Sequence, residues 1–326
     1  MNRRDSLRAL LALWAAPLAA KAVEPKNVPV IGFLSPAKFS PSTAVSFNGL
    51  RDGLRALGYV DGKTIKIESR WGDGKPERLP RLAEELVRLK VDVIAAAAAP
   101  SVIAASHATK TIPIVATDLE TDPVAGGLVA NLARPGGNIT GLFLDQPALT
   151  GKWLQLLGEV VPGMQHVAVL WDATTGPYQL AAIKAAAQAM SVELQIVEFR
   201  DAAALEDALG AALTKRPQAL VQLSSPVINS QSKATAAFAS MHRLPGISAF
   251  RKFPESGGLM SYGPNLSTFF RRQAQYVVEI LRGAKPGDLP VELPSHFEFV
   301  VNLKAATAIG AKVPQSTLMM ADDVID

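Results

Sequence analysis

The chain of 326 residues contains no cysteine. Within it, disulfide bonds, cysteine–metal sites, thiol catalysis and a lipid anchor on an N-terminal cysteine are therefore excluded. Histidine is scarce too, and the four histidines lie far apart, without the spacing of metal ligands. They are His107, His166, His242 and His296. We expect neither a metal site nor a cofactor.

Sequence motifs for nucleotide binding and nucleophilic catalysis are absent as well. There is no G-x-S-x-G nucleophile elbow and no G-x-x-x-x-G-K-[ST] phosphate loop. The glycine-rich turn Pro135–Asn138 precedes a predicted strand, whereas a dinucleotide-binding loop follows a strand and opens a helix. Since no nucleophile, base and orienting residue emerge together from these motifs, we expect a protein that is not an enzyme.

Positive charge is concentrated at the N-terminus. The whole chain has a formal net charge of +4, but residues 1–22 hold four basic residues against one acidic residue. The remainder is close to neutral, at about +1 by difference. Because nucleic-acid-binding proteins present a clustered cationic surface, this distribution argues against a nucleic-acid partner.

The first 22 residues have the layout of an export signal. Three arginines precede an uninterrupted apolar run, Ala9–Ala20, and Ala20-Lys21-Ala22 has the small-residue pattern at which such signals are cleaved. The run is shorter than the about 20 apolar residues that a membrane span needs. We expect cleavage near Ala22 and a periplasmic location. Both the general secretion route and the twin-arginine route stay open, because Ser6 stands where the twin-arginine signal usually has a bulkier apolar residue.

The rest of the chain alternates between strand-like and helix-like segments. Apolar runs such as Val28–Leu34 and Val91–Ala98 predict buried strands, and the leucine spacing over Leu79–Leu89 predicts a helix. Residues 28–144 follow the order β-α-β-α-β-α-β-α-β, and a second, similar series follows. We therefore predict an α/β protein with parallel sheets in two lobes and a cleft between them.

Lobe boundaries and some local features are also predicted. The N-terminal lobe is expected to comprise residues 28–144 plus about 264–288, and the C-terminal lobe residues 148–262 plus about 295–326. We expect helices around Val124–Leu132 and over Asn229–Arg243, a capping role for Ser101, and a solvated last turn at Asp322-Asp323.

Ligand contacts are expected where strands end, because open parallel sheets bind ligands outside the carboxyl ends of their strands. An acidic stretch, Asp118 to Asp122 with Glu120 between them, follows one such end. From the first lobe the candidates are Ser35, Trp71, Ser101, Thr117 and Asp118, with Asp122 and Asp145 in addition. From the second lobe they are Trp171, Asp172, Tyr178, Ser224, Ser225, Phe250 and Tyr262.

This set mixes apolar and polar groups, as small-molecule sites do. Aromatic rings would stack on the solute, an aspartate would pair with an ammonium group, and the helix N-terminus at Ser101 would receive a carboxylate. The mixture favours a zwitterion such as an amino acid. The alternatives are ordinary packing of Trp71 and Trp171, and helix capping by Asp122.

Short motifs in a fixed order carry a family resemblance. The most distinctive are Asp122-Pro123-Val124 and LARPGGNITG at residues 132–141. Further ones are IGFLS at 31–35, GLRDGL at 49–54, GGLMSYG at 257–263 and LRGAKP at 281–286. The chain resembles the solute-binding components of bacterial ABC transporters, in the group that includes tryptophan/tyrosine-type binding proteins. The resemblance implies the fold of type I periplasmic binding proteins, with two Rossmann-like lobes, hinge strands and a ligand held in the cleft.

The resemblance also implies that the protein binds a small-molecule solute, works with an ABC permease in the inner membrane, and closes its lobes on binding. We expect hinges near Asp145–Pro147, Tyr262–Asn265 and Pro290–His296, and a monomer. A sensor that presents the closed form to a signalling partner is a second hypothesis, and a secreted enzyme on the same scaffold is a third. Neighbouring genes for a permease and an ATPase, or for a histidine kinase, would separate the first two.

Overall fold

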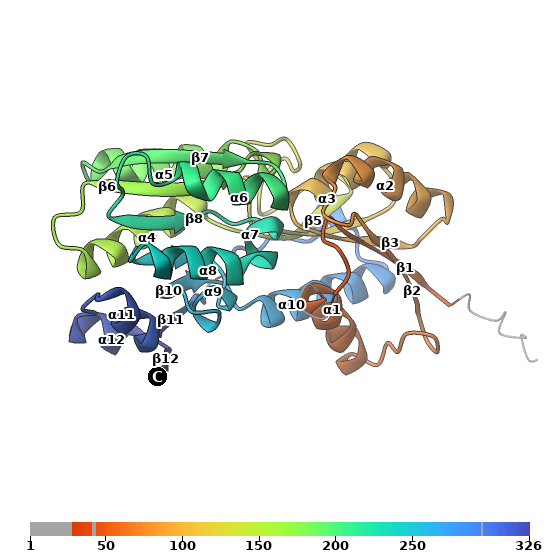
Figure 1. Cartoon of the computed structure of the whole chain (residues 1–326). Helices are drawn as coiled ribbons and strands as arrows, with labels where there is room; N and C mark the ends of the chain where they lie inside the picture. The colour runs from red at the N-terminus through yellow and green to blue at the C-terminus, as the bar shows by residue number, and fades with distance from the viewer. Residues whose placement is uncertain (1–27, 41–43, 295) are drawn as a thin grey trace, which may run out of the picture.

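The computed structural model describes residues 28–40, 44–294 and 296–326. Figure 1 shows two lobes side by side, each built around one sheet. The expected export signal and its cleavage near Ala22 lie outside the described residues. Within those residues no helix is long and apolar enough to cross a membrane.

The first lobe is built on a five-stranded parallel sheet in the order β2-β1-β3-β4-β5. Its strands are β1 (Val30–Ser35), β2 (Lys66–Trp71), β3 (Val93–Ala97), β4 (Ile114–Asp118) and β5 (Ile139–Phe143). Helices α1 (Val45–Ala56) and α10 (Leu266–Leu281) cover one face, and α2 (Leu79–Arg88) and α3 (Ala99–Ala108) cover the other, with the short η1 (Pro76–Arg78) before α2. Because both faces are covered, the central strands read as continuous apolar runs.

The second lobe is built on a seven-stranded sheet in the order β12-β11-β10-β9-β8-β6-β7. Its strands are β6 (His166–Asp172), β7 (Glu193–Phe199), β8 (Ala219–Gln222), β9 (Gly246–Ser248), β10 (Met260–Gly263), β11 (Glu298–Asn302) and β12 (Asp323–Ile325). Its helices are α4 (Gln146–Val160), η2 (Ala173–Thr175), α5 (Tyr178–Ala189), α6 (Ala202–Ala211), α7 (Pro226–Ser230), α8 (Ser232–Met241), α9 (Lys252–Glu255), α11 (Leu303–Ile309) and α12 (Gln315–Met320). The β10–β11 pair is antiparallel, and the other pairs are parallel.

The chain crosses between the lobes three times, between β5 and α4, between β10 and α10, and between η3 (Pro286–Asp288) and β11. Helix α10 belongs with the first sheet, where Gln273 Nε2 donates to the Val115 carbonyl at 2.8 Å. On the third crossing, Glu292 N donates to the Gly141 carbonyl at 2.9 Å, and Phe143 N donates to the Glu292 carbonyl at 3.0 Å. These contacts attach α10 and the segment up to Glu292 to the sheet of the first lobe.

Helices α1 and α10 pack closely because α1 has glycines, Gly49 and Gly53, where it faces α10. A Cβ built on Gly49 would lie 2.8 Å from Phe270 Cβ, and one built on Gly53 would lie 2.7 Å from Ala274 Cβ. Such distances are below van der Waals contact, so only glycine fits. Close packing brings the N-terminal turns of both helices to the same end of the sheet.

The helix predicted around Val124–Leu132 does not form, and turns take its place. The amide groups of Val124 and Ala125 donate to the Asp122 side chain, and Gly126 N donates to the Asp122 carbonyl. Gly127 then adopts a φ of 69°, which ends the turn. A single turn fixes several dihedral angles for few hydrogen bonds, so it does not extend through two glycines.

Three smaller predictions are also corrected. The Asn229–Arg243 helix is divided at Gln231 into α7 and α8. Helix α3 begins at Ala99, so Ser101 lies inside its first turn and does not cap it. Near the C-terminus Asp322 accepts from Phe299 N at 2.8 Å, and Asp323 begins β12. Asp322 is exposed as predicted, but the pair lies at the edge of the sheet and not in a last helical turn, because the chain end returns to pair with β11.

Candidate functional site

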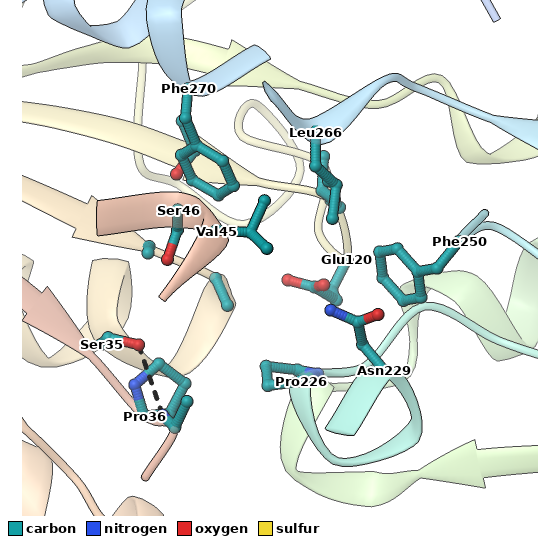
Figure 2. Close-up of a pocket in the computed structure, with 15 residues that line it drawn as sticks. Ser35, Pro36, Val45, Ser46, Glu120, Pro226, Asn229, Phe250, Leu266 and Phe270 are labelled. Carbon is teal, nitrogen blue, oxygen red and sulfur yellow. Dashed lines mark hydrogen bonds between the residues drawn. The ribbon is translucent and has the colours of Figure 1, made fainter. Parts of the chain in front are cut away.

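A cavity lies between the lobes at the carboxyl ends of the strands, and Figure 2 shows the residues around it. It holds about 610 Å³ of empty space, its open mouth included. The first lobe contributes Ser35, Pro36, Ala37, Val45, Ser46, Ala97, Ala98, Thr117, Leu119, Glu120, Leu266 and Phe270. The second lobe contributes Pro226, Asn229 and Phe250. The walls are thus mainly apolar with a few polar groups, the composition of a small-molecule site.

Among the described residues that line this cavity, Glu120 is the one with an ionisable side chain. Figure 2 shows its carboxylate turned into the space between Val45 and Asn229. The Ala99 amide donates to its Oε2 at 3.0 Å, and the Ser224 hydroxyl donates to its Oε1 at 2.9 Å. Ala99 opens α3 in the first lobe, while Ser224 follows β8 in the second lobe. The side chain therefore joins the lobes across the cleft.

The environment of Glu120 disfavours its charged form. Burial raises the pKa of Glu120 to about 8, with the neighbouring Asp118 and Asp172 adding to the rise. The hydrogen bonds from Ala99 and Ser224 act in the opposite direction, because they stabilise the carboxylate. Burial outweighs them, since a 2 % exposed carboxylate has almost no water around it.

Asp118 is fully buried and faces its own loop. Its Oδ1 accepts from Glu120 N at 2.9 Å and from Thr121 N at 3.0 Å, and its Oδ2 accepts from the Thr121 hydroxyl at 2.5 Å. Burial raises the pKa of Asp118 above its ordinary value. The carboxylate therefore shapes the loop that carries Glu120 and does not line the cavity.

Asp172 does the same at the end of β6. Its Oδ1 accepts from the Thr174 amide at 3.0 Å and hydroxyl at 2.7 Å, and its Oδ2 accepts from the Ser225 hydroxyl at 2.6 Å. Ser225 in turn caps α7, accepting from Val227 N at 3.0 Å. This network fixes α7, whose Pro226 and Asn229 line the cavity.

Of the aromatic candidates other than Tyr178, one lines the cavity and three pack elsewhere. Phe250 lines the cavity. Trp71 packs against Phe33, with ring centroids 5.3 Å apart, and against two further phenylalanines. Trp171 donates its indole N–H to the Gly176 carbonyl at 3.1 Å, and Tyr262 stacks on Phe297 with centroids 5.5 Å apart.

Three further candidates, Asp122, Asp145 and Tyr178, lie outside the cavity wall. Asp122 holds its own turn, and Asp145 caps α4 by accepting from Ala148 N at 3.2 Å. Tyr178 begins α5 in the second lobe, and burial together with the Asp122 carboxylate raises its pKa to about 12. Asp122 and Tyr178 therefore face each other from opposite lobes.

Of the fourteen candidates, Ser35, Thr117 and Phe250 line the cavity, and Ser224 reaches it through Glu120. Ser101 is buried, and its hydroxyl has no partner among the described residues. The candidate list omitted the helix residues Val45, Ser46, Asn229, Leu266 and Phe270. They lie near the N-terminal ends of helices and not at strand ends, so the strand-end rule does not find them.

A second cavity, with about 930 Å³ of empty space including its open mouth, adjoins the first, and both are lined by Pro36, Ala37 and Pro226. Asp172 and Thr174 lie in its wall. Within the described parts of the chain, no group of three or more histidine or acidic residues is placed to hold a metal ion.

Comparisons with known proteins agree on one family. Residues 28–325 match the profile of the family described as ABC transporter substrate binding protein. A tyrosine-binding protein of Clostridioides difficile is 26 % identical over 268 residues, which cover 80 % of this chain and 75 % of that protein.

Two solved structures have the same architecture over most of the chain. A conserved domain protein from Vibrio cholerae is 27 % identical with a TM-score of 0.85, covering 91 % of this chain and 99 % of that one. An ABC domain from Streptococcus pneumonia in complex with L-Trp is 25 % identical with a TM-score of 0.83, with the same coverage. The expected fold, that of type I periplasmic binding proteins, is confirmed by the topology and these neighbours.

Proposed function

This chain belongs to the family of ABC transporter substrate-binding proteins, and we propose that it captures an amino acid with a large apolar side chain for an ABC importer. The observation that carries the proposal is the interlobe cavity, in which one carboxylate stands among aromatic and aliphatic walls. The similar proteins from C. difficile and S. pneumonia, named for tyrosine binding and solved with L-Trp, support this ligand class.

The cavity offers a partner for each part of such a ligand. The Glu120 carboxylate would pair with the ammonium group, and Phe250, Leu266 and Phe270 would enclose the side chain. The ligand carboxylate would lie near the Ser35 and Ser46 hydroxyls, at the start of α1. A helix N-terminus favours an anion, because its first N–H groups lack partners within the helix.

We further propose that the protein works as a monomer in the periplasm and delivers its solute to a permease of the inner membrane. The export signal expected over residues 1–22 supports the location, and membership of the family supports the partner. The lobes would close around the solute, hinged on the three crossing segments. On the third crossing the mobile part would begin after Glu292, which is hydrogen-bonded to the first lobe.

A thermal-shift screen of the twenty amino acids, followed by calorimetry, tests the ligand class. We expect L-tryptophan, L-tyrosine or L-phenylalanine to raise the melting temperature, since a ligand at a hundred times its Kd adds about 2.7 kcal/mol. Phe250→Ala should weaken binding about tenfold or more, because truncating a buried aromatic contact costs more than 1.4 kcal/mol. Phe238→Ala is the matched control, because Phe238 packs against His242 outside the cavity, with ring centroids 4.7 Å apart. Stabilisation by sugars and by no amino acid would contradict the proposal.

A further inference from the structure

The Glu120 carboxylate lacks a basic partner in the closed cleft. No lysine, arginine or histidine is among the described residues that line the cavity. The donors to its oxygens, the Ala99 amide and the Ser224 hydroxyl, are neutral, and its side chain also shares a hydrogen bond with the Asp118 carboxyl. A buried carboxylate without a cation costs several kcal/mol, and such a group takes up a proton instead. The site therefore requires one positive charge, from a proton or from a ligand.

The charged groups that face Glu120 strengthen this requirement. Asp118 approaches from the same loop, and Asp172 approaches from the end of β6 in the other lobe. Both are acids, and both disfavour the ionised form of Glu120. The parts of α1, α7 and α10 that line the cavity contribute Val45, Ser46, Pro226, Asn229, Leu266 and Phe270, none of which titrates. Nothing described in the wall supplies the missing charge.

We propose that Glu120 carries a proton in the closed, unliganded cleft and that the ammonium group of the ligand takes the place of this proton. The ligand class rests on the proposed function. On binding, the O–H bond of the Glu120 carboxyl breaks and its proton goes to solvent. The resulting carboxylate keeps its bonds from Ala99 and Ser224 and accepts a further bond from the ammonium. Beside Glu120 one positive charge thus replaces another, while the ligand's own carboxylate lies at the Ser35 and Ser46 side of the cavity.

The exchange makes Glu120 a specificity-determining residue. A solute with an ammonium group gains a charge-assisted hydrogen bond, which is stronger than a neutral one. A neutral or anionic solute meets a carboxylic acid and displaces no proton. The exchange also links protonation to closure, because the bond from Ser224 exists only when the lobes meet. In an open cleft water would surround the carboxylate and return its pKa toward the ordinary 4.5, so acid should favour closure of the unliganded protein.

The unliganded protein provides a test that needs no ligand. Carbon-13 NMR of glutamate carboxyls, with the Glu120→Gln variant to assign the resonance, should show Glu120 titrating well above 4.5. Small-angle scattering should show the wild type becoming more compact as the pH falls from about 8 to about 5, while Glu120→Gln stays compact throughout. The exposed Glu77→Gln serves as control and should behave like the wild type. A Glu120 midpoint near 4.5, or the same pH response in wild type and Glu120→Gln, would overturn the proposal.

Calorimetry with L-tryptophan tests the exchange itself. In two buffers of different ionisation enthalpy near pH 6, we expect the wild type to release about one proton on binding. Glu120→Gln should release none and bind about tenfold or more weakly, having lost a charge-assisted bond. Indole-3-propionate, which lacks the ammonium group, should release no proton from either form.

The two proposals fail in different ways. Tight binding of L-tryptophan without proton release, or equal binding by Glu120→Gln, would overturn the exchange and leave the function standing. If L-tryptophan and the other amino acids fail to bind while Glu120 still titrates high, the proposed ligand class is wrong and the protonated closed state is supported.

Discussion

The loops that follow β4 and β6 are built alike, yet only the first presents an acid to the cavity. Each starts with a buried aspartate, Asp118 or Asp172, which accepts the amide of the residue two positions on and a threonine hydroxyl. In the second loop the residue two positions after the aspartate is Thr174, and both its amide and its hydroxyl donate to Asp172. In the first loop it is Glu120, whose side chain lines the cavity and accepts hydrogen bonds from Ala99 and Ser224.

This difference separates two roles that look the same in a sequence. A strand-end aspartate is an obvious ligand candidate, but here its oxygens are occupied by the turn that it forms. The residue between the aspartate and the threonine is the one that reaches the ligand space. We therefore propose Glu120, and not Asp118, as the partner of the ligand's ammonium group.

The largest effects should come from removing the two aspartates. Asp118→Ala and Asp172→Ala each leave three donors without their partner in a buried loop, which should lower the free energy of unfolding by about 2–4 kcal/mol in urea titrations. Asp118→Ala should weaken binding of L-tryptophan more strongly, because the Asp118 loop carries Glu120. Asp201→Ala, which removes an exposed cap of α6, should cost only about 1 kcal/mol. If either aspartate variant lost much less unfolding free energy than the other, the two loops would not be held in the same way.

Glycine substitutions in the two lobes should have opposite signs. Gly53→Ala places a Cβ 2.7 Å from Ala274 Cβ and 3.0 Å from the Arg271 backbone, so it should destabilise by about 1–3 kcal/mol through overpacking. It should also weaken ligand binding, because α1 and α10 carry four cavity residues. Gly158→Ala lies in α4 with open space around it, and should stabilise by about 0.5–1 kcal/mol. Stability unchanged in Gly53→Ala would show that the α1–α10 contact yields easily.

The stability contributed by Glu120 at the cavity and by Glu292 near the hinge should change with pH in opposite directions. Arg272 lowers the pKa of Glu292 below 4.5, so this pair contributes stability above that pH and loses it as the pH falls. Glu120 has a raised pKa, so its contribution is present below 4.5 and is lost as the pH rises toward about 8. The difference in urea midpoint between the wild type and each variant, Glu292→Gln or Glu120→Gln, should therefore change with pH in opposite directions.

The Glu292 effect should be small, at most about 1 kcal/mol, because the Arg272 and Glu292 side chains are 37 % and 39 % exposed. Parallel pH curves for Glu292→Gln and Glu120→Gln would show that the two sites do not differ as described.

The smallest effect is expected at the contact between Tyr178 and Asp122. Tyr178→Phe removes the hydroxyl that faces Asp122 across the cleft, and it should weaken closure by less than about 1 kcal/mol, since the contact is partly exposed. Ultraviolet titration should assign a phenol of pKa about 12 to Tyr178, absent from the variant. A tenfold loss of affinity would instead make this contact part of the ligand site.

The alternation of apolar runs with amphipathic segments was sufficient to predict the bilobed α/β class, because burial on both faces of a parallel sheet imposes that pattern along the whole chain. It failed where a short segment depended on local competition. Over Val124–Leu132 the paired glycines and the Asp122 turn prevailed over helix propensity. At Ser101 the helix began three residues earlier than a capping serine suggested, because its N-cap is Ala98.

By itself the sequence determined the class of fold, the family and the strand ends where a ligand would lie, since these follow from periodicity and motif order. Only the tertiary structure decided which side chains meet there. Val45 and Phe270 are 225 positions apart in the chain and share one cavity because glycines let α1 approach α10. Glu120 lacks a cation because no basic side chain of the described cavity wall comes near it. Both facts depend on packing between distant segments, which local sequence does not encode.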